Sequence, residues 1–320
     1  MNTDDLPRDA LDLVHDDLFA VSAALRAQLA ARAPGQAVWF TAPDPDRAGL
    51  YEGEPTPAGR HRSLAGWVML AEELGAVLLT PRPAGPGRVL LGLRRLDRHA
   101  SWQTGGAASG DPEKYGAASA FARIRKFEEP PFLHAFTRAI DFVDPAPGAR
   151  ILALGCNRGD ELDALRRLRP DHRLDCVGVD HAASAIEQAR RLHPGMRFIA
   201  ADLNRLDAPP LAAVGRFDLI LALNVLHSPS VDGKAILQRL VAAHLTPAGA
   251  VIVGLPNVRY VDHTLSHGAR VKGFSHPELS VLVRDAAYYR RYLARHRFRV
   301  MITGRHTLLV CGRPLPSRLG

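Results

Sequence analysis

The stretch Arg150-Ile-Leu-Ala-Leu-Gly-Cys-Asn-Arg-Gly-Asp-Glu-Leu162 decides the fold, together with Cys176-Val-Gly-Val-Asp180. An apolar strand runs into a turn that contains Gly155 and Gly159, and the turn opens a helix. A second apolar strand then ends on the carboxylate of Asp180. That acid follows the turn by about twenty residues, the spacing that places a carboxylate on the ribose of a nucleotide cofactor. The stretch therefore predicts a cofactor with an adenosine end.

Strands and helices alternate from Arg150 onwards. Apolar runs predict strands over 150–154, 174–179, 197–200, 217–223 and 249–254, and helical spacing predicts helices over 159–168, 182–192 and 233–244. This alternation favours a parallel sheet with right-handed crossovers. The end of the chain differs. A helix over 285–296 precedes strands over 298–303 and 306–311, and the two residues between these strands leave room only for an antiparallel hairpin. The pattern predicts a parallel sheet closed at its far end by an antiparallel strand.

Residues 148–312 resemble a class I S-adenosylmethionine-dependent methyltransferase. Four segments are similar to the motifs of that family in order and spacing: Ile151-Leu-Ala-Leu-Gly-Cys-Asn-Arg-Gly159, Val177-Gly-Val-Asp180, Ala201-Asp-Leu203 and Phe217-Asp-Leu-Ile-Leu-Ala-Leu-Asn-Val-Leu-His227. The terminal hairpin is similar to the antiparallel seventh strand of the family. The resemblance implies an α/β fold with a Rossmann-like seven-stranded methyltransferase sheet, parallel with an antiparallel last strand, plus a small N-terminal α+β domain.

The resemblance also implies a cofactor, S-adenosyl-L-methionine, and the residues that hold it. In this family the glycine turn and the start of the following helix face the methionine portion. Asp180 is expected to accept from the ribose hydroxyls, and Asp202 from the adenine amino group while Leu203 packs on the ring. The expected cofactor-binding residues are Gly155, Cys156, Asn157, Gly159, Asp180, His181, Asp202, Leu203 and Asn224.

The carboxyl end of the fourth strand is the expected place for chemistry, because ligands of open α/β sheets bind at that edge. His227 is predicted to take a proton from the methyl acceptor, with a purely structural packing role as the alternative. Asn224 is predicted to line the catalytic site. Residues expected to contact the acceptor are Tyr115, Arg123, Asn257, Arg259 and Tyr260.

Two residues depart from the family pattern. Ala153 stands where the family has an acid, so the usual contact to the amino group of the cofactor lacks its carboxylate, and Asp160 is a hypothesis for its replacement. Asn157 stands where the family has glycine, which is tolerable because asparagine readily adopts left-handed backbone angles. A nicotinamide dinucleotide would require Gly-x-Gly-x-x-Gly, and the turn Gly-Cys-Asn-Arg-Gly-Asp lacks the second and third of these glycines.

Composition and the positions of turn-forming residues divide the chain into three predicted segments. Residues 1–97 form the N-terminal α+β domain, with helices expected over Leu11–Ala31 and, capped by Ser63, through Leu74. Residues 98–147 are expected to form a linker and lid-like helices, and residues 148–320 the methyltransferase domain. His263 and His267 share a face only if their segment is helical, and without a third ligand they predict no metal site.

The bulk composition is that of a globular protein, with 47% apolar and 23% charged residues. No apolar run has membrane-spanning length, the acidic N-terminus does not resemble a signal peptide, and three scattered cysteines form no disulfide framework. These features predict a cytoplasmic protein with no membrane partner. The abundance of Ala, Arg, Gly and Pro favours a bacterial origin.

Positive charge is concentrated at the C-terminal end. The chain carries a formal charge of +8, and residues 256–320 hold twelve Lys and Arg against three Asp and Glu. This face fits either a polyanionic partner or a solvated helix surface. Because no RNA-binding module accompanies the charge, a small-molecule or peptide acceptor is favoured. A tRNA- or rRNA-directed methyltransferase that uses the basic C-terminal face and a non-catalytic cofactor-binding protein remain the alternatives. The sequence does not indicate an oligomeric state.

Overall fold

The protein divides into two compact units. Unit 1 comprises residues 1–101 with 260–266, and unit 2 comprises residues 102–259 with 267–320. The computed structural model describes residues 7, 9–97, 99–100, 112–206, 209–228, 231–267 and 279–316. Most of the polar part of the expected linker, Arg98 and 101–111, therefore lies outside the described residues. Within the described part of the chain, no helix has both the length and the apolar character needed to cross a bilayer.

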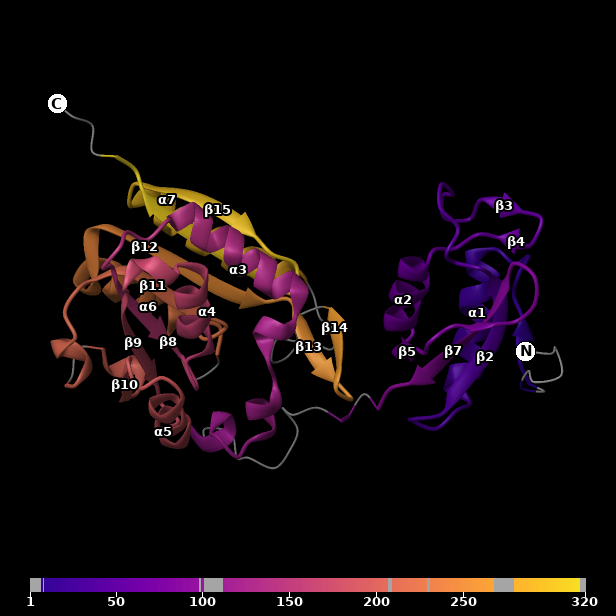
Figure 1. The fold of residues 1–320 in the computed structure, drawn as a ribbon, viewed down its shortest axis with the longest axis horizontal. Helices are drawn as coiled ribbons and strands as arrows, with labels where there is room; N and C mark the ends of the chain where they lie inside the picture. The colour runs from indigo at the N-terminus through magenta and orange to yellow at the C-terminus, as the bar shows by residue number, and fades with distance from the viewer. Residues whose placement is uncertain are drawn as a thin grey trace. The chain divides into compact units, whose positions relative to one another are not determined.

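Unit 2 is built on a seven-stranded sheet with the order β10-β9-β8-β11-β12-β16-β15 (Figure 1). The strands are β8 (Arg150–Leu154), β9 (Asp175–Asp180), β10 (Arg197–Ala200), β11 (Phe217–Leu223), β12 (Leu245–Pro256), β15 (Phe298–Thr303) and β16 (Thr307–Pro314). From β10 to β12 all neighbours pair in parallel. Strand β16 pairs antiparallel with both β12 and β15, so the only reversed strand of this sheet is β16.

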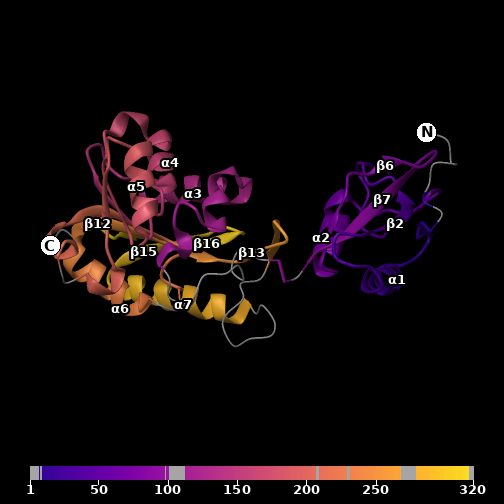
Figure 2. The same ribbon diagram turned by 90° about the horizontal axis from the view of Figure 1, so that it is seen from below.

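Helices cover both faces of this sheet (Figure 2). Helices α3 (Pro130–Val143), α4 (Asp160–Leu168) and α5 (Ala183–Leu192) lie on one face, and α6 (Gly233–Arg239) and α7 (Leu279–Arg295) on the other. The alternation of side chains along the buried strands separates two cores. Ile151 and Ala153 of β8 pack with α3 and α4, whereas Leu152 and Leu154 belong to the core that contains α6 and α7.

The strand order reverses between β8 and β11, and this reversal places the functional edge. Chain connections leave β8 toward β9 and β10 on one side, whereas β11 and β12 continue on the other. The chain therefore leaves β8 and β11 in opposite directions at their carboxyl ends, the position at which doubly wound sheets bind their ligands. The glycine turn follows β8, Asp180 ends β9, and Asn224 follows β11.

A leading segment, residues 112–128, precedes α3. It consists of three single-turn 3₁₀ helices, η2 (Pro112–Tyr115), η3 (Ala120–Arg123) and η4 (Lys126–Glu128). The serine hydroxyl of Ser119 caps η3 by accepting from the amide of Ala122 at 3.2 Å. The Pro130-Pro131 pair then starts α3, because proline is compatible with the first helical turn, where amides lack intrahelical partners.

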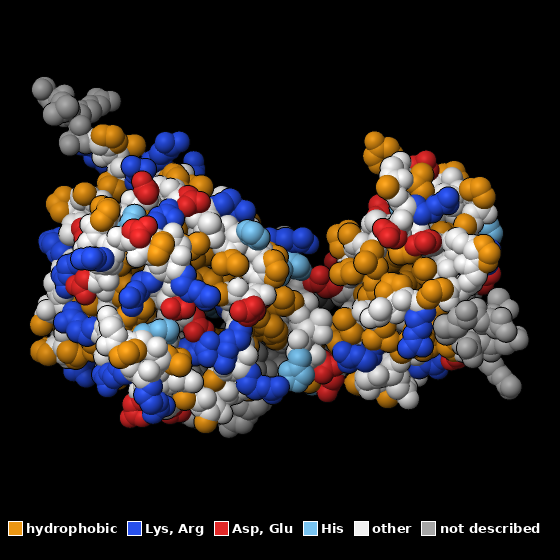
Figure 3. Space-filling view, viewed as in Figure 1, with side chains coloured by type: hydrophobic (Ala, Val, Ile, Leu, Met, Phe, Trp, Pro, Cys, Tyr) orange, Lys and Arg blue, Asp and Glu red, His pale blue; other side chains and the backbone are white. Residues whose placement is uncertain are grey.

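Unit 1 is an α+β unit with its own core. Its elements are β1 (Leu11–Asp12), α1 (Leu18–Ala30), β2 (Ala37–Pro43), β3 (Pro55–Thr56), β4 (Gly59–Arg60), α2 (Leu64–Glu73), β5 (Ala76–Leu78), β6 (Arg82–Pro83) and β7 (Arg88–Arg95). Trp67 and Phe40 pack in its centre with ring centroids 5.1 Å apart. Helix α2 also exposes Leu64, Val68 and Met69, and hydrophobic side chains gather over this helix in Figure 3.

The predicted seven-stranded sheet and its antiparallel strand are confirmed, with two corrections. The reversed strand lies between β12 and β15, not at the edge, because the terminal hairpin inserts its second strand beside β12. The helix expected over Leu11–Ala31 begins only at Leu18. Leu11 and Asp12 instead extend the sheet of unit 1 beside β2, and Asp17 caps the helix by accepting from the amide of Ala20 at 2.9 Å.

Candidate functional site

The turn after β8 requires its glycines. Gly155 and Gly159 have φ of 63° and 88°, in the left-handed region that side chains disfavour. A Cβ atom on Gly155 would lie 2.7 Å from Val225, and one on Gly159 would lie 2.9 Å from Phe198. Asn157 also has a positive φ of 45°, which agrees with the tolerance expected of asparagine. The turn is thereby closed tightly against its neighbours and ends at the N-terminus of α4.

The carboxylate of Asp180 is buried beside this turn. Its Oδ2 accepts from the amide of Asn157 at 2.8 Å, and its Oδ1 accepts from the amide of Ala182 at 2.9 Å. These two bonds tie the end of β9 to the glycine turn and to the start of α5. A carboxylate has about four lone-pair sites, so two remain to accept further hydrogen bonds. His181, the next residue, is exposed and places its Nδ1 3.5 Å from Oδ1 of Asp180.

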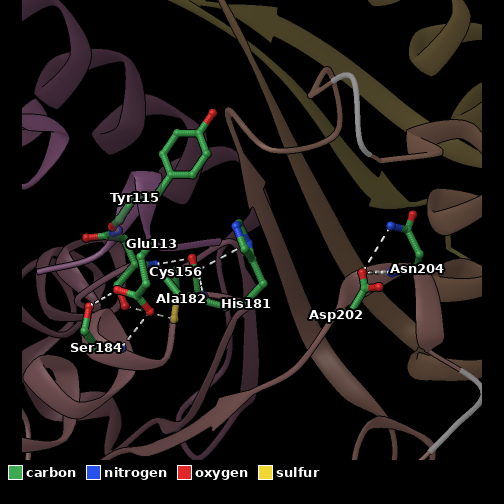
Figure 4. A network of polar contacts seen from close by, with 10 residues as sticks. Glu113, Tyr115, Cys156, His181, Ala182, Ser184, Asp202 and Asn204 are labelled. Carbon is green, nitrogen blue, oxygen red and sulfur yellow. Dashed lines mark hydrogen bonds and ion pairs between the residues drawn. The ribbon is translucent and has the colours of Figure 1, made fainter. Parts of the chain in front are cut away.

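The leading segment is fastened over the same site (Figure 4). The side-chain amide of Asn157 donates to the carbonyl of Tyr115 at 2.5 Å. Glu113 accepts from the hydroxyl of Ser184 at the start of α5, and that hydroxyl accepts from the amide of Ala117 at 2.9 Å. The ring of Tyr115 lies edge-on to His181, with centroids 5.9 Å apart. The predicted contact residue Tyr115 thus lies beside Asn157 and His181, two of the residues predicted to bind the cofactor.

Replacing Glu113 by Gln is expected to loosen this segment. The loss of the charge-assisted bonds to Ser184 should raise the hydrogen-exchange rate of the amides over 112–124 several-fold, because such bonds are stronger than neutral ones. Glu187→Gln is the matched control, since Glu187 is exposed on the same helix, α5. Exchange over 112–124 that is the same in both variants would show that Glu113 does not hold the segment.

The third motif follows β10. Asp202 is exposed, and its Oδ1 accepts from the amide and the side-chain nitrogen of Asn204 at 2.9 and 3.1 Å. These bonds orient the carboxylate and leave its second oxygen available (Figure 4). Leu203 is 4% exposed and belongs to the core on the α6 and α7 face. Of this pair, Asp202 therefore presents its polar group to solvent, while Leu203 is mainly a core residue.

Glu161 is a buried acid that the motif comparison missed. It lies in the first turn of α4, next to Asp160, whose carboxylate is held by Arg158 at 2.9 Å. Burial raises the pKa of Glu161 to about 8, and the nearby carboxylates of Asp160 and Asp180 add to the shift. The sequence could have indicated this buried acid, because Glu161 lies on the apolar face of α4, one turn before Leu165. A buried carboxyl beside the turn thus exists on α4, although β8 carries only Ala153.

Replacing Glu161 by Gln is expected to stabilise the unliganded protein at alkaline pH. The folded-state pKa is raised from 4.5 to about 8, so ionisation opposes folding, and the stability of the wild type falls as pH rises between these values. The variant lacks this loss and should gain on the order of 3 kcal/mol at about pH 8 relative to about pH 5. Thermal unfolding across this range measures the gain. Asp163→Asn, on the partly exposed side of α4, should show no such pH dependence.

The end of β11 carries the two residues predicted to be catalytic. Asn224 has a φ of 55°, and its amide donates to the carbonyl of Gly254 at 3.0 Å. Its Oδ1 accepts from the hydroxyl of the buried Thr307 at 3.4 Å. Asn224 is therefore fixed between β12 and β16 at the carboxyl edge of the sheet, with its side-chain nitrogen left to donate.

His227 lines a pocket of about 220 Å³ between the β11 loop, α6 and α7. Lys234 of α6 and Asp285 and Tyr288 of α7 line the same pocket. The protein atoms around His227 lower its pKa to about 4, and Asp285 opposes this shift. The residue as a whole is exposed, and the lowered pKa makes its imidazole neutral at pH 7. A neutral imidazole at this edge can accept a proton.

The structure places the residues predicted to contact the acceptor in different elements. The amide of Asn257 donates to the carbonyl of His306 at 2.9 Å, and its side chain donates to that of Arg305 at 3.0 Å, so Asn257 anchors the β15–β16 turn. Arg123 is exposed at the end of η3. Arg259 and Tyr260 lie on β13 (Val258–Val261), which pairs with β14 (Thr264–His267). Tyr260 groups with unit 1 and Arg259 with unit 2.

The hairpin also changes the interpretation of the histidines beyond β13. His263 and His267 would share a face in a helix, but here they lie in a turn and a strand. His267 instead lies edge-on to His306, with ring centroids 5.3 Å apart. Nδ1 of His306 lies 3.2 Å from the buried carboxylate of Glu129, which Lys126 also approaches at 3.6 Å. This largely buried group of polar side chains joins the start of α3 to the β15–β16 turn, and no local pattern predicted it.

Comparisons with known proteins agree with the sheet and the turn. Residues 152–251 match the family described as a methyltransferase domain. A trans-aconitate 2-methyltransferase of Rhodopseudomonas palustris (strain BisB18) is 33% identical over 108 residues, which are 34% of this chain and 39% of that protein. An uncharacterised 37.1 kDa protein in transposon TN4556 of Streptomyces fradiae is 28% identical over 119 residues, 37% of this chain and 33% of that protein. The chain thus matches less than half the length of either curated relative.

Two solved structures align with parts of this chain. A TehB-like SAM-dependent methyltransferase from Corynebacterium glutamicum aligns with a TM-score of 0.37 and 20% identity, covering 57% of this chain and 88% of that one. A SAM-dependent methyltransferase from Aquifex aeolicus aligns with a TM-score of 0.41 and 14% identity, covering 65% of this chain and all of that one, 100%.

Proposed function

We propose that this chain transfers a methyl group from S-adenosylmethionine to an acceptor, because residues 152–251 match the family described as a methyltransferase domain and lie within a seven-stranded sheet of the class I type. The observation that carries the proposal is the buried carboxylate of Asp180. It ends the strand next to the glycine turn, is oriented by two backbone amides at 2.8 and 2.9 Å, and retains lone pairs for two ribose hydroxyls.

We assign one group of the chain to each portion of this cofactor. Asp202 is placed to accept from the adenine amino group, and Asp180 from the ribose. Gly155 and Gly159 keep the turn in its left-handed conformation and packed against Val225 and Phe198, where a Cβ atom would collide. The amides at the start of α4 suit the methionine carboxylate.

Glu161 is our candidate partner for the ammonium group of the methionine portion. Ala153 offers no carboxylate, and Asp160 is already engaged by Arg158 at 2.9 Å. The carboxyl of Glu161 is buried in the first turn of α4, close to Asp180. A bound cation would favour its ionised form. Glu161 therefore takes the place of Asp160, which the sequence suggested for the contact to the amino group of the cofactor.

The chemistry divides simply between cofactor and protein. S-adenosylmethionine supplies the methyl group: the acceptor lone pair forms the new bond, and the sulfonium sulfur keeps the electron pair of the broken carbon–sulfur bond. The protein has to position the acceptor, which can account for most of the catalysis as a proximity effect. His227 is neutral and takes the proton that the acceptor loses. With a pKa of about 4 it is a weak base, so it suits an acceptor that becomes acidic as the bond forms.

The class of acceptor is open to more than one proposal. A pocket of about 220 Å³ beside His227 admits a small molecule, a peptide side chain or one edge of a nucleobase, so size alone does not choose. The sequence favours a small molecule or peptide. Methylation of a nucleic acid is the second candidate, and it is favoured by stacked aromatic rings among the arginines of α7.

Calorimetric titration with the demethylated product, S-adenosylhomocysteine, tests the cofactor assignment directly. We expect one site per chain with a micromolar dissociation constant, about −8 kcal/mol, and no heat with NAD, because the turn lacks two dinucleotide glycines. Binding of NAD in place of S-adenosylhomocysteine, or no binding by folded protein, would contradict the proposal. Bound cofactor without turnover of any acceptor would instead favour a non-catalytic cofactor-binding protein.

A further inference from the structure

Helix α7 and the residue that follows it carry a row of three neighbouring rings, of which the first two are stacked. Tyr288 and Tyr292 lie one turn apart, with planes 15° apart and centroids separated by 6.4 Å. Tyr292 continues the row to His296, with centroids 4.2 Å apart and planes inclined by 36°. The spacing of four residues places all three rings on one face of the helix. The row is a ladder of three planar surfaces, and His296 at its end is exposed.

Cations surround this ladder. Arg291 and Arg295 line a groove of about 350 Å³ together with Tyr288, Tyr292 and Gln238 of α6. The ammonium of Lys234 lies 4.7 Å from the ring centroid of Tyr288. Further arginines on or just beyond α7 are exposed, namely Arg284, Arg290, Arg297 and Arg299. We refer to Tyr288, Arg291, Tyr292, Arg295 and His296 as the α7 strip.

The α7 strip is continuous with the pocket at the end of β11. Tyr288 lines both the groove of the strip and the pocket of His227. Lys234 and Asp285 line that pocket as well. A ligand that extends along the ladder therefore reaches the proposed acceptor site at its Tyr288 end. Tyr288 and Tyr292 are partly buried and also pack against the core beneath α7, so the fold holds these rings in place beside the groove.

We propose that the α7 strip binds single-stranded nucleic acid, with bases stacked on its rings and phosphates paired with its arginines. Aromatic rings with interleaved cations are the arrangement that holds single strands without reading their sequence. The bound strand would present one of its bases to the pocket of His227. This last statement rests on the proposed methyl transfer, whereas binding by the strip does not.

Fluorescence anisotropy of a labelled oligouridine of about 15 nucleotides, matched to known site sizes, tests the inference on the full chain. We expect micromolar or tighter binding at about 50 mM salt and a steep loss toward about 200 mM. Tyr292→Ala should weaken binding by about 5- to 100-fold, as expected for one lost stacking platform, whereas Tyr292→Phe should bind within about 2-fold of the wild type because its ring is retained.

Two arginine variants complete the test. Arg295→Ala should lower the slope of log affinity against log salt by about 0.7, the value for one phosphate contact to a single strand. Arg191→Ala removes the same charge from an exposed position of α5, on the opposite face of the sheet (Figure 2), and should leave the slope unchanged. A DNA oligomer of equal length, run in parallel, distinguishes the two sugars.

Two outcomes would overturn the inference. One is the absence of oligonucleotide binding at low salt. The other is binding that both arginine variants weaken equally and Tyr292→Ala leaves unchanged, since this would indicate a diffuse charge effect that an acidic protein could equally exploit. Titration of the same preparations with S-adenosylhomocysteine keeps the two proposals apart, because intact cofactor binding with no strand binding contradicts only the strip.

Discussion

Asp180→Asn is expected to weaken the binding of S-adenosylhomocysteine by at least about 100-fold, which corresponds to about 3 kcal/mol. Hydrogen bonds to a charged group contribute about 1.5–3 kcal/mol each, and the variant replaces a carboxylate that is predicted to hold both ribose hydroxyls. It also weakens the bonds from the amides of Asn157 and Ala182, which now measure 2.8 and 2.9 Å. Isothermal titration calorimetry measures the change.

Asp175→Asn provides the matched control for this variant. Asp175 starts the same strand, β9, at the opposite end from the site, where it forms a largely exposed ion pair with Arg150 at 3.0 Å. Exposed pairs of this kind contribute little, so the control should bind as the wild type does and unfold at nearly the same temperature. Asp180→Asn with an affinity within a few-fold of the control would remove Asp180 from the cofactor site.

Gly159→Ala is expected to produce the second large effect. Alanine at a φ of 88° adopts a disfavoured left-handed conformation at a cost of about 1–2 kcal/mol. Its Cβ atom would also lie 2.9 Å from the ring of Phe198, and overpacking of a core costs a similar further amount, about 1–3 kcal/mol. The melting temperature of the domain should fall by roughly 10 °C, and the distorted turn should bind S-adenosylhomocysteine at least about 10-fold more weakly.

Gly195→Ala separates this effect from a general cost of replacing glycine. The nearest side-chain atom to a Cβ at position 195 belongs to Arg166, at 3.8 Å, so the new methyl group has room. The control should leave both the melting temperature and the affinity close to those of the wild type. Equal behaviour of the two variants in thermal unfolding would show that the turn does not need a glycine at position 159.

The elements that the sequence predicted well are those specified by neighbouring residues. The run Ile151–Leu154 is apolar because β8 is buried on both faces, and Asp180 stands out because a carboxylate rarely ends a buried strand without a function. The terminal hairpin was recognisable because two residues cannot form a crossover. Its position within the sheet was not, since the pairing of β16 with β12 joins residues 51 to 61 positions apart and leaves no local signal.

The parts of the site that escaped prediction depend on distant contacts. Glu113 and Ser184 are 71 residues apart in the sequence, and Glu129 and His306 are 177 apart. A single sequence contains no local pattern that would predict either contact. Leu11 looked helical because its spacing continues that of α1, yet pairing with Phe40 turned it into a strand. Glu161 was different: an acid on the apolar face of α4 was visible, but the family motif drew attention to Asp160.

The ladder on α7 lies between these cases. Its tyrosines recur at helical spacing, and its arginines contribute to the positive charge of the C-terminal end. That charge alone fits either a polyanionic partner or a solvated helix surface. Two structural observations connect that charge to the proposed catalytic residue His227. The planes of Tyr288 and Tyr292 are 15° apart, and Tyr288 also lines the pocket of His227. Side-chain rotamers set these angles, and the sequence does not specify them locally.

Transfer of a radiolabelled methyl group tests the central claim most directly. The protein is incubated with labelled S-adenosylmethionine and a cell extract, and the products are separated by size and by sensitivity to nuclease. We expect label in an acceptor fraction with the wild type and none with Asp180→Asn, and the α7 strip predicts that this fraction is sensitive to nuclease. No label in any fraction, from wild-type protein that binds S-adenosylhomocysteine, would contradict methyl transfer.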